Sequence, residues 1–215
     1  FRNWGDYMSK AKEKRINEVI KKASELFIEK SIEEVTVVDI ANSLNIGEAS
    51  IYRYFGKKEN LVYKVAIYLW NEVKAKYFDY QLIYKESKGL EQVKQFFNCF
   101  IDIYSNNQSF FIFINDFDNY IIDKNIAMDD INEYEKELLT IKDIFDNIWN
   151  IGINDKSIKA NINREEIYFT YTHALLSICS KLSKRAILHS DSLVSSIKQI
   201  TLLIDVFIDY IKGGN

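Results

Sequence analysis

The side chains whose types and spacing most suggest a binding chemistry lie between residues 36 and 61 of this 215-residue chain. Ser50 and Arg53 are three residues apart, so they share one face if the segment is helical. The hydroxyl of Tyr52 can donate to a phosphate, and a guanidinium such as that of Arg53 can bind a guanine edge or a phosphate. This arrangement favours a helix that presents hydrogen-bond donors to nucleic acid.

Two short helices joined by a tight turn must position these donors. Thr36 is a good N-cap for the first helix, and Asp39 completes a capping-box-like pair with it. Asn45 or Gly47 can take a positive φ in the turn. The second short helix is expected at residues 48–55 and is barely two turns long.

Helices of this length are not stable alone, so flanking helices, expected at residues 10–30 and 59–84, must support them. Ile51 and Phe55 would form the buried side of the second short helix. The pair has the geometry of a helix-turn-helix, whose second helix can lie in the major groove. Lys58 opens the next helix, where free N–H groups and the positive dipole end suit phosphate. From spacing alone, a plain helical hairpin with a solvated polar face remains the alternative.

The composition favours an all-α fold. The chain has no Pro and 7 Gly, so few positions interrupt a helix. Apolar residues make up 47% and charged residues 27%, which is typical of globular rather than disordered chains. We expect about nine helices in one or two domains.

Three motifs occur in a fixed order: Ala23-x-x-Leu26-Phe27, Thr36-Val37-x-Asp39-Ile40-Ala41, and Ser50-Ile51-Tyr52-x-Tyr54-Phe55-x-x-Lys58-Glu59-x-Leu61. Together they resemble the N-terminal domain of TetR/AcrR-type transcription regulators. The resemblance covers less than a quarter of the chain. It implies an all-helical homodimer, with a DNA-binding domain at residues 9–57 and a larger ligand-binding and dimerisation domain at residues 58–215.

By position, the resemblance implies a set of contacts with double-stranded operator DNA: Thr36, Gly47, Glu48, Ser50, Tyr52, Arg53, Tyr54 and Lys58. Among these, Thr36 and Lys58 would hold phosphates. Three positions depart from the family pattern. Ser31 replaces the usual Gly at the end of the first helix, and Val38 stands where a polar or basic residue is common. Glu48 is acidic, so it would repel phosphate, although it could accept from cytosine N4.

Aromatic residues are dense between residues 90 and 151. An aromatic core and an apolar pocket with a few polar groups both fit this density, and in this family the two share one space. The predicted lining of a site for a small apolar or aromatic effector is Phe96, Phe100, Phe113, Phe117, Trp149 and His173. A hydrogen-bonded histidine in the core or at an interface is the alternative for His173.

The last two helices are expected at residues 163–188 and 192–212. Both have apolar residues on two sides, so each needs two packing partners. One partner is the core of the same subunit, and the other is the same helix pair of a second subunit. The pattern therefore predicts a homodimer through a four-helix interface, and the family resemblance implies the same.

Several site classes have no sequence signal. There is no catalytic triad, zinc-like ligand spacing or glycine-rich phosphate loop, so we expect neither an enzyme nor a cofactor or metal. Cys99 and Cys179 lie among apolar residues and are expected to be reduced, buried thiols. No secretory signal pattern or long uncharged apolar run is present, which predicts a cytoplasmic protein without a membrane span.

The overall charge is a weak guide. Residues 1–58 carry 11 basic and 9 acidic side chains, a bias too small to indicate nucleic-acid binding alone. The motifs therefore carry the hypothesis of a DNA-binding regulator, by family default a repressor released when a small, largely apolar molecule binds. The alternative, motivated by Val38 and Glu48, is a regulator of the same fold that acts mainly through a protein partner, with weak or lost operator binding.

Overall fold

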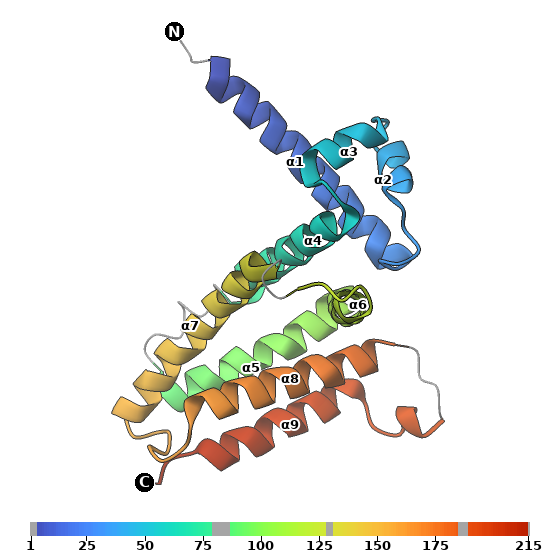
Figure 1. Ribbon diagram of the computed structural model, residues 1–215. Coiled ribbons are helices and arrows are strands. Elements are labelled where there is room, and N and C mark those ends of the chain that lie inside the picture. The colour runs from blue at the N-terminus through green and yellow to red at the C-terminus, as the bar shows by residue number, and fades with distance from the viewer. Residues whose placement is uncertain (1–3, 79–86, 128–130, 185–188, 215) are drawn as a thin grey trace. The chain divides into compact units, whose positions relative to one another are not determined.

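The computed structural model describes residues 4–78, 87–127, 131–184 and 189–214. Within these ranges there are nine α-helices and no β-strand (Figure 1). They are α1 (Trp4–Glu29), α2 (Val37–Ser43), α3 (Glu48–Phe55), α4 (Lys58–Val73), α5 (Gly89–Asn106), α6 (Gln108–Asp123), α7 (Asn132–Asn154), α8 (Arg164–Ser183) and α9 (Ser196–Ile211). The predicted all-α fold is confirmed.

The helices are shared between two compact units. The first unit contains Phe1–Trp70 and Asp116–Tyr134, and the second contains Asn71–Asn115 and Glu135–Asn215. Helices α4, α6 and α7 therefore each contribute residues to both units. This grouping by contacts differs from the division after residue 57, which stays a prediction.

Helix α1 supports the two short helices of the first unit. It begins at Trp4, earlier than the predicted start at residue 10, because no proline stops it. Its apolar stripe, which includes Val19, Ala23 and Phe27, is fully buried. The stripe provides the docking surface that helices as short as α2 and α3 require.

Helix α4 differs from the single long helix predicted for residues 59–84. The α-helix ends at Val73 and continues as a π-helix, Lys74–Phe78 (η1). Residues 79–86 lie outside the described ranges, so the rest of the prediction cannot be compared. Neither Gly nor Pro occurs in η1, so the sequence carried no signal for this change of helix type.

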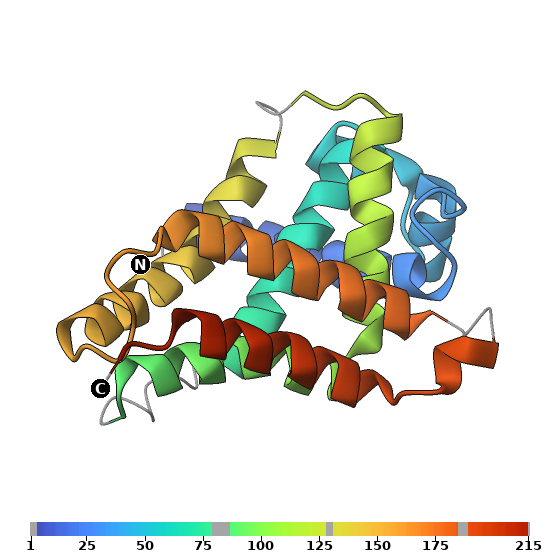
Figure 2. The ribbon, with the colours of Figure 1, turned by 90° about the horizontal axis from the view of Figure 1, so that it is seen from below.

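Helices α5, α8 and α9 lie side by side in the second unit (Figure 1 and Figure 2). Aromatic rings join all three. The ring of Phe97 in α5 lies 6.3 Å from that of Tyr171 in α8 and 4.9 Å from that of Phe207 in α9, between centroids. Phe97 and Phe207 have no exposed surface. These contacts place the aromatic core between the three helices.

Helices α5 and α7 meet at two glycines. A Cβ atom on Gly89 would overlap the backbone of Gly152, so this close approach excludes a side chain. The N–H of Gly89 donates to Asp155 Oδ2 at 2.8 Å, which satisfies one free amide at the start of α5. Small residues and a capping carboxylate therefore fix the start of α5 against the end of α7.

The boundaries of the last two helices need correction. Helix α8 ends at Ser183 rather than at residue 188, although residues 185–188 lie outside the described ranges. Helix α9 begins at Ser196 rather than at residue 192. A short 3-10 helix, His189–Ser192 (η4), precedes it, and Ser195 is the N-cap, accepting from the N–H of Lys198. Serine hydroxyls that bond nearby backbone groups favour such caps over helix interiors.

Candidate nucleic-acid interface

The N-terminus of α2 is closed by the predicted capping box. Thr36 Oγ1 accepts from the N–H of Asp39 at 3.1 Å, and Asp39 Oδ2 accepts from the N–H of Thr36 at 2.8 Å. The Thr36 hydroxyl also donates to Asp39 Oδ2 at 2.6 Å. These hydrogen bonds lower the pKa of Asp39, which keeps its carboxylate ionised. Thr36 itself is exposed, so its position is open to a ligand.

The turn between α2 and α3 uses one of the two residues that could take a positive φ. Asn45 has φ 52°, whereas Gly47 is in extended geometry with φ −73° and serves as the N-cap of α3. The N–H of Ile46 donates to the carbonyl of Ala41 at 3.0 Å, which closes the turn. A Cβ on Gly47 would meet nothing within 4 Å, so the space in front of α3 is open.

Helix α3 has the two faces that its sequence predicted. Ile51 and Phe55 are buried, with 1% and 8% of their surface exposed. On the other side Tyr52 and Arg53 are exposed, and Ser50 is half-buried. The face that carries the predicted donors is therefore accessible.

Tyr54 links this face to the body of the helix. It is half-buried, and the Arg53 guanidinium lies 5.4 Å from the centroid of its ring. Such a contact orients a guanidinium while leaving its N–H donors free to bind.

The positions that depart from the family pattern are also accessible. Gly47 and Glu48 are both exposed at the start of α3, and Val38 on α2 has 45% of its surface exposed. An exposed Val gains nothing from burial within this chain. Ser31, the third departure, has a φ of 140°, a region that favours glycine.

Two residues after α3 end it in a way that the sequence reading missed. Gly56 takes φ 75°, and its N–H donates to the carbonyl of Tyr52. The side chain of Asn60 donates from Nδ2 to the carbonyl of Phe55 at 2.6 Å. A Gly after the last helical residue is a usual C-cap signal, whereas the contribution of Asn60 depends on the fold of α4.

Lys58 is directed into the first unit. Its Nζ donates to the carbonyl of Ile32 at 2.5 Å and lies 5.7 Å from the centroid of the Tyr120 ring. It is half-buried, and desolvation lowers its pKa. Its role as a phosphate contact stays a prediction, because in this structure the ammonium is engaged by protein groups.

Five of the six residues predicted to line a ligand pocket are buried: Phe96, Phe100, Phe113, Phe117 and Trp149. The rings of Phe96 and Phe97 are joined to Phe145 by centroid distances of 5.3 and 5.7 Å. Trp149 extends this cluster, at 5.6 Å from Phe145. Phe117 belongs to the first unit instead, where its ring packs 4.9 Å from that of Tyr134. The set is thus divided between the two units.

His173, the sixth, lies elsewhere. It is exposed on α8, and its nearest recorded ring is that of Phe169, at 6.0 Å. Phe169 has 43% of its surface exposed. His173 is therefore on the outer face of α8 rather than among the buried rings.

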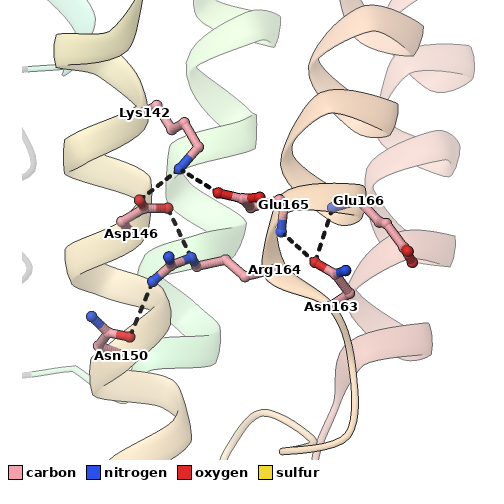
Figure 3. A network of polar contacts seen from close by, with 7 residues as sticks. All are labelled: Lys142, Asp146, Asn150, Asn163, Arg164, Glu165 and Glu166. Atoms are coloured by element: carbon pink, nitrogen blue, oxygen red, sulfur yellow. Dashed lines mark hydrogen bonds and ion pairs between the residues drawn. The ribbon is translucent and has the colours of Figure 1, made fainter.

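A polar network joins α7 and α8 beside the aromatic cluster (Figure 3). Asp146 lies between two cations, with Lys142 Nζ at 2.7 Å from Oδ2 and Arg164 Nε at 3.1 Å from Oδ1. Arg164 Nη1 also donates to Asn150 Oδ1 at 3.5 Å, and Lys142 Nζ lies 3.7 Å from Glu165. The side chains of Lys142 and Asp146 are only 12% and 21% exposed. Charges this sheltered need each other, because each alone would carry a desolvation penalty.

The network borders Tyr168. Lys142 Nζ lies 6.0 Å from its ring centroid, and the ring is 5.2 Å from that of Phe145. Burial, helped by the carboxylates of Asp146 and Asp143, raises the pKa of Tyr168. Its hydroxyl therefore keeps its proton and is a neutral donor at the edge of the aromatic cluster.

A groove of about 670 Å³ opens at the junction of α8 and α9. It is lined by Ile178, Lys181, Leu182, Lys184, Ser190, Asp191, Val194, Ser196, Lys198, Gln199 and Leu202. None of the six predicted ligand residues is among these described lining residues. The sequence reading did not anticipate this groove, whose lining comes from both sides of the α8–α9 connection.

Other site classes were sought in the described ranges. No group of three or more His, Cys, Asp or Glu side chains is placed there to hold a metal ion. The predicted buried thiols are confirmed: Cys99 and Cys179 are free and buried, and burial raises the pKa of each to about 12. Among the described helices, none is both long and apolar enough to cross a membrane.

Comparison with solved structures identifies the fold. The ketosteroid transcriptional regulator KstR2 of Mycobacterium tuberculosis shares 15% identity, with a TM-score of 0.61 over 93% of this chain and 96% of that chain. A putative transcriptional regulator from Saccharomonospora viridis, in complex with choline, shares 12% over 94% and 100%, with a TM-score of 0.67. The regulator FadR from Bacillus subtilis, in complex with stearoyl-CoA, shares 15% over 90% and 98%, with a TM-score of 0.62.

The sequence comparison is more local. A search of curated proteins finds no match. Residues 19–65 match the model of the bacterial regulatory proteins of the tetR family. This segment contains α2 and α3 with the exposed donors of α3. The chain therefore carries the N-terminal domain of the tetR family of bacterial regulatory proteins, on a fold that solved regulators of this family share.

Proposed function

We propose that this protein is a DNA-binding transcription regulator, a repressor that leaves its operator when a small, largely apolar molecule binds residues 58–215. The observation that carries the first half is the division of α3 into two faces. Ile51 and Phe55 hold the helix on its support, while Tyr52 and Arg53 are exposed. A short helix with this division is suited to the major groove. Thr36, Gly47, Glu48, Ser50 and Tyr54 complete the proposed contact set, with Lys58 considered separately below.

Exposed apolar side chains on α9 support the proposed homodimer. Leu202, Val206 and Tyr210 recur every fourth residue, and each has more than half of its surface exposed. Phe169 on α8 is also exposed. An exposed apolar stripe of this length is typical of a protein interface. A two-fold dimer would present two recognition helices to a palindromic site.

The dimer is tested by breaking this stripe. Leu202→Glu combined with Val206→Glu should give a monomer in light scattering after size exclusion. Ile122→Glu is the matched control, because Ile122 is 74% exposed but lies on α6 in the first unit. A double variant that stays dimeric would contradict the assignment of the interface to α9.

The DNA-binding half is tested by selecting duplexes from a random-sequence pool. We expect enrichment of a palindromic sequence, bound at least about a thousandfold more tightly than unrelated DNA. The same selection with Tyr52→Ala and Arg53→Ala combined is the control, and should enrich nothing. Failure of the native protein to enrich any sequence, at salt concentrations where it binds DNA at all, would contradict operator recognition.

The ligand half rests on the buried aromatic cluster and on the neutral hydroxyl of Tyr168 at its edge. Among the solved relatives, one regulator was bound to stearoyl-CoA and another to choline. The test adds long-chain acyl-CoA, choline and steroid probes to the selected protein–DNA complex and measures release. We expect release by an apolar probe, which requires that it bind the DNA-free state more tightly. An operator complex that no apolar molecule releases would contradict this half.

One observation favours a second candidate function. Val38 is exposed on α2 beside the acidic Glu48, and neither suits a phosphate backbone. A regulator that acts mainly through a protein partner, with weak operator binding, would use such a surface. Co-purification of a stoichiometric partner that is lost in Val38→Lys, together with an unsuccessful duplex selection, would favour this alternative.

A further inference from the structure

The turn between α1 and α2, residues 30–36, is held by side chains that are distant in the sequence. The N–H of Ile32 donates to Asp116 Oδ2 at 2.8 Å, and the carbonyl of Ile32 accepts from Lys58 Nζ at 2.5 Å. Ile32 has no exposed surface. Both backbone groups of one buried residue are thus satisfied by side chains of α6 and α4, which replace the water they would otherwise bind.

A second set of contacts grips the next residue of the turn. Glu33 pairs with Lys124 at 2.9 Å, and this hydrogen bond lowers the pKa of Glu33. The ring of Tyr120 on α6 lies 5.7 Å from the ammonium of Lys58 and 5.6 Å from that of Lys124. One aromatic ring therefore faces both cations that hold the turn.

The held turn contains strained backbone. Ser31 has φ 140°, a conformation that L-residues rarely adopt. Its own side chain offers one local support, since Ser31 Oγ accepts from the N–H of Glu34 at 3.2 Å. Such strain persists when the surroundings enforce it. The bonds from Asp116 and Lys58, both made to the following residue, are the enforcing contacts.

The turn leads directly into the proposed interface. It ends at Thr36, the N-cap of α2, and α2 and α3 have only 7 and 8 residues. Helices so short take their position from what they are attached to and docked on. A change in the turn therefore moves the capping residue, and with it the donors of α3.

We infer that Lys58 and Asp116 are positioning residues for the DNA interface: the Lys58 ammonium holds the α1–α2 turn rather than a phosphate, and Asp116 holds the same turn from α6. The inference rests on the proposed DNA binding and changes the role of one residue in the predicted contact set. It also adds a residue that lies 84 positions from its partner. Only the fold brings the two together.

Salt dependence separates the two roles of Lys58. A lysine that neutralises a phosphate contributes about 0.9 to the slope of log K against log salt concentration. Lys58→Met keeps the apolar stem and removes the charge. We expect specific binding to the selected duplex to weaken about tenfold, the factor for one hydrogen bond of about 1.4 kcal/mol, with the slope unchanged. Lys57→Met removes a neighbouring charge as the matched control. A slope reduced by about 0.9 in Lys58→Met alone would overturn the inference.

Two substitutions at Asp116 test the contact from α6. Asp116→Leu removes the acceptor and should weaken specific binding about tenfold, while binding to unrelated DNA is unchanged. Asp116→Asn retains an oxygen that can accept from the N–H of Ile32, so it should restore most of the affinity. Wild-type affinity in Asp116→Leu, or no rescue by Asp116→Asn, would overturn the role of Asp116.

Hydrogen exchange in the DNA-free protein separates this inference from the proposed function. The Ile32 amide should exchange slowly in the wild type and in Asp116→Asn, and at least about tenfold faster in Asp116→Leu. Unchanged exchange would overturn the hold on the turn whether or not DNA binds. Conversely, a wild type that enriches no duplex overturns the DNA part, and faster exchange in Asp116→Leu then still establishes the contact.

Discussion

The helix-turn-helix of the first unit and the aromatic cluster of the second unit differ in how far apart their contacts lie in the sequence. The capping box joins Thr36 to Asp39, and the turn bond joins Ile46 to Ala41. In the cluster, Phe97 packs on Phe207, more than a hundred residues away. Local contacts leave a pattern in the sequence, whereas distant ones do not.

The two regions also use aromatic residues in opposite ways. Tyr52 on α3 has 44% of its surface exposed, and Phe97 on α5 has none. The exposed ring is available to a partner, and the buried one supplies stability through area removed from water. The difference suggests that α3 carries the function of its unit while α5 carries the stability of its own. The following predictions test that division.

The largest effect is expected in the cluster. Phe97→Ala should lower the free energy of unfolding by about 3–5 kcal/mol, because it removes a fully buried ring and leaves a cavity. Tyr52→Ala is the control and should change it by less than about 0.5 kcal/mol. Urea unfolding followed by circular dichroism measures both. Comparable losses would contradict the division between stability and function.

The next effect concerns DNA. Arg53→Ala should weaken specific binding by about 1–3 kcal/mol, if its guanidinium reads a base edge. Fluorescence anisotropy with the selected duplex and with unrelated DNA measures the difference. The variant Arg53→Lys keeps the charge but lacks the planar fork, so it should rescue little. Equal losses on both DNAs would mean that Arg53 holds only phosphate.

A smaller effect is expected at the α2 cap. Thr36→Ala removes the oxygen that accepts from the N–H of Asp39 and should destabilise the protein by about 1 kcal/mol. Thr36→Ser retains that oxygen and should stay close to the wild type. If both variants unfold like the wild type, the capping box does not contribute measurably to stability.

Relief of strain at Ser31 is expected to raise stability. Ser31→Gly should increase the free energy of unfolding by up to about 1 kcal/mol, because φ 140° suits glycine, although the chain gains unfolded-state entropy. Ser31→Ala loses the same hydroxyl but keeps the strain, so it should be less stable than both. An Ala variant as stable as the Gly variant would rule out strain at this position.

The smallest effect depends on pH. Hydrogen bonds from Thr36 lower the pKa of Asp39, so its ionised form stabilises the folded state. This contribution is complete above the ordinary Asp value of about 3.9 and is lost as the pH falls through the lowered pKa. The stability difference between wild type and Asp39→Asn should therefore shrink in acid. A difference that is constant from pH 7 to pH 2 would contradict this linkage.

The sequence by itself determined the helical class, the bounds of α3 and the two faces of that helix. These follow from local causes: the absence of proline, a capping pair three residues apart, and apolar residues at helical spacing. The family motifs then identified the unit, because their residues and spacing lie within one continuous segment.

The tertiary structure decided what depends on distant partners. It directed Lys58 toward Ile32 and Tyr120, brought Asp116 to the α1–α2 turn, and put His173 on the outside of α8. It also ended α8 and began α9 at positions that the apolar periodicity did not mark. Periodicity reports which face of a helix is buried, but not which element buries it. That choice is made only when segments far apart in the chain pack together.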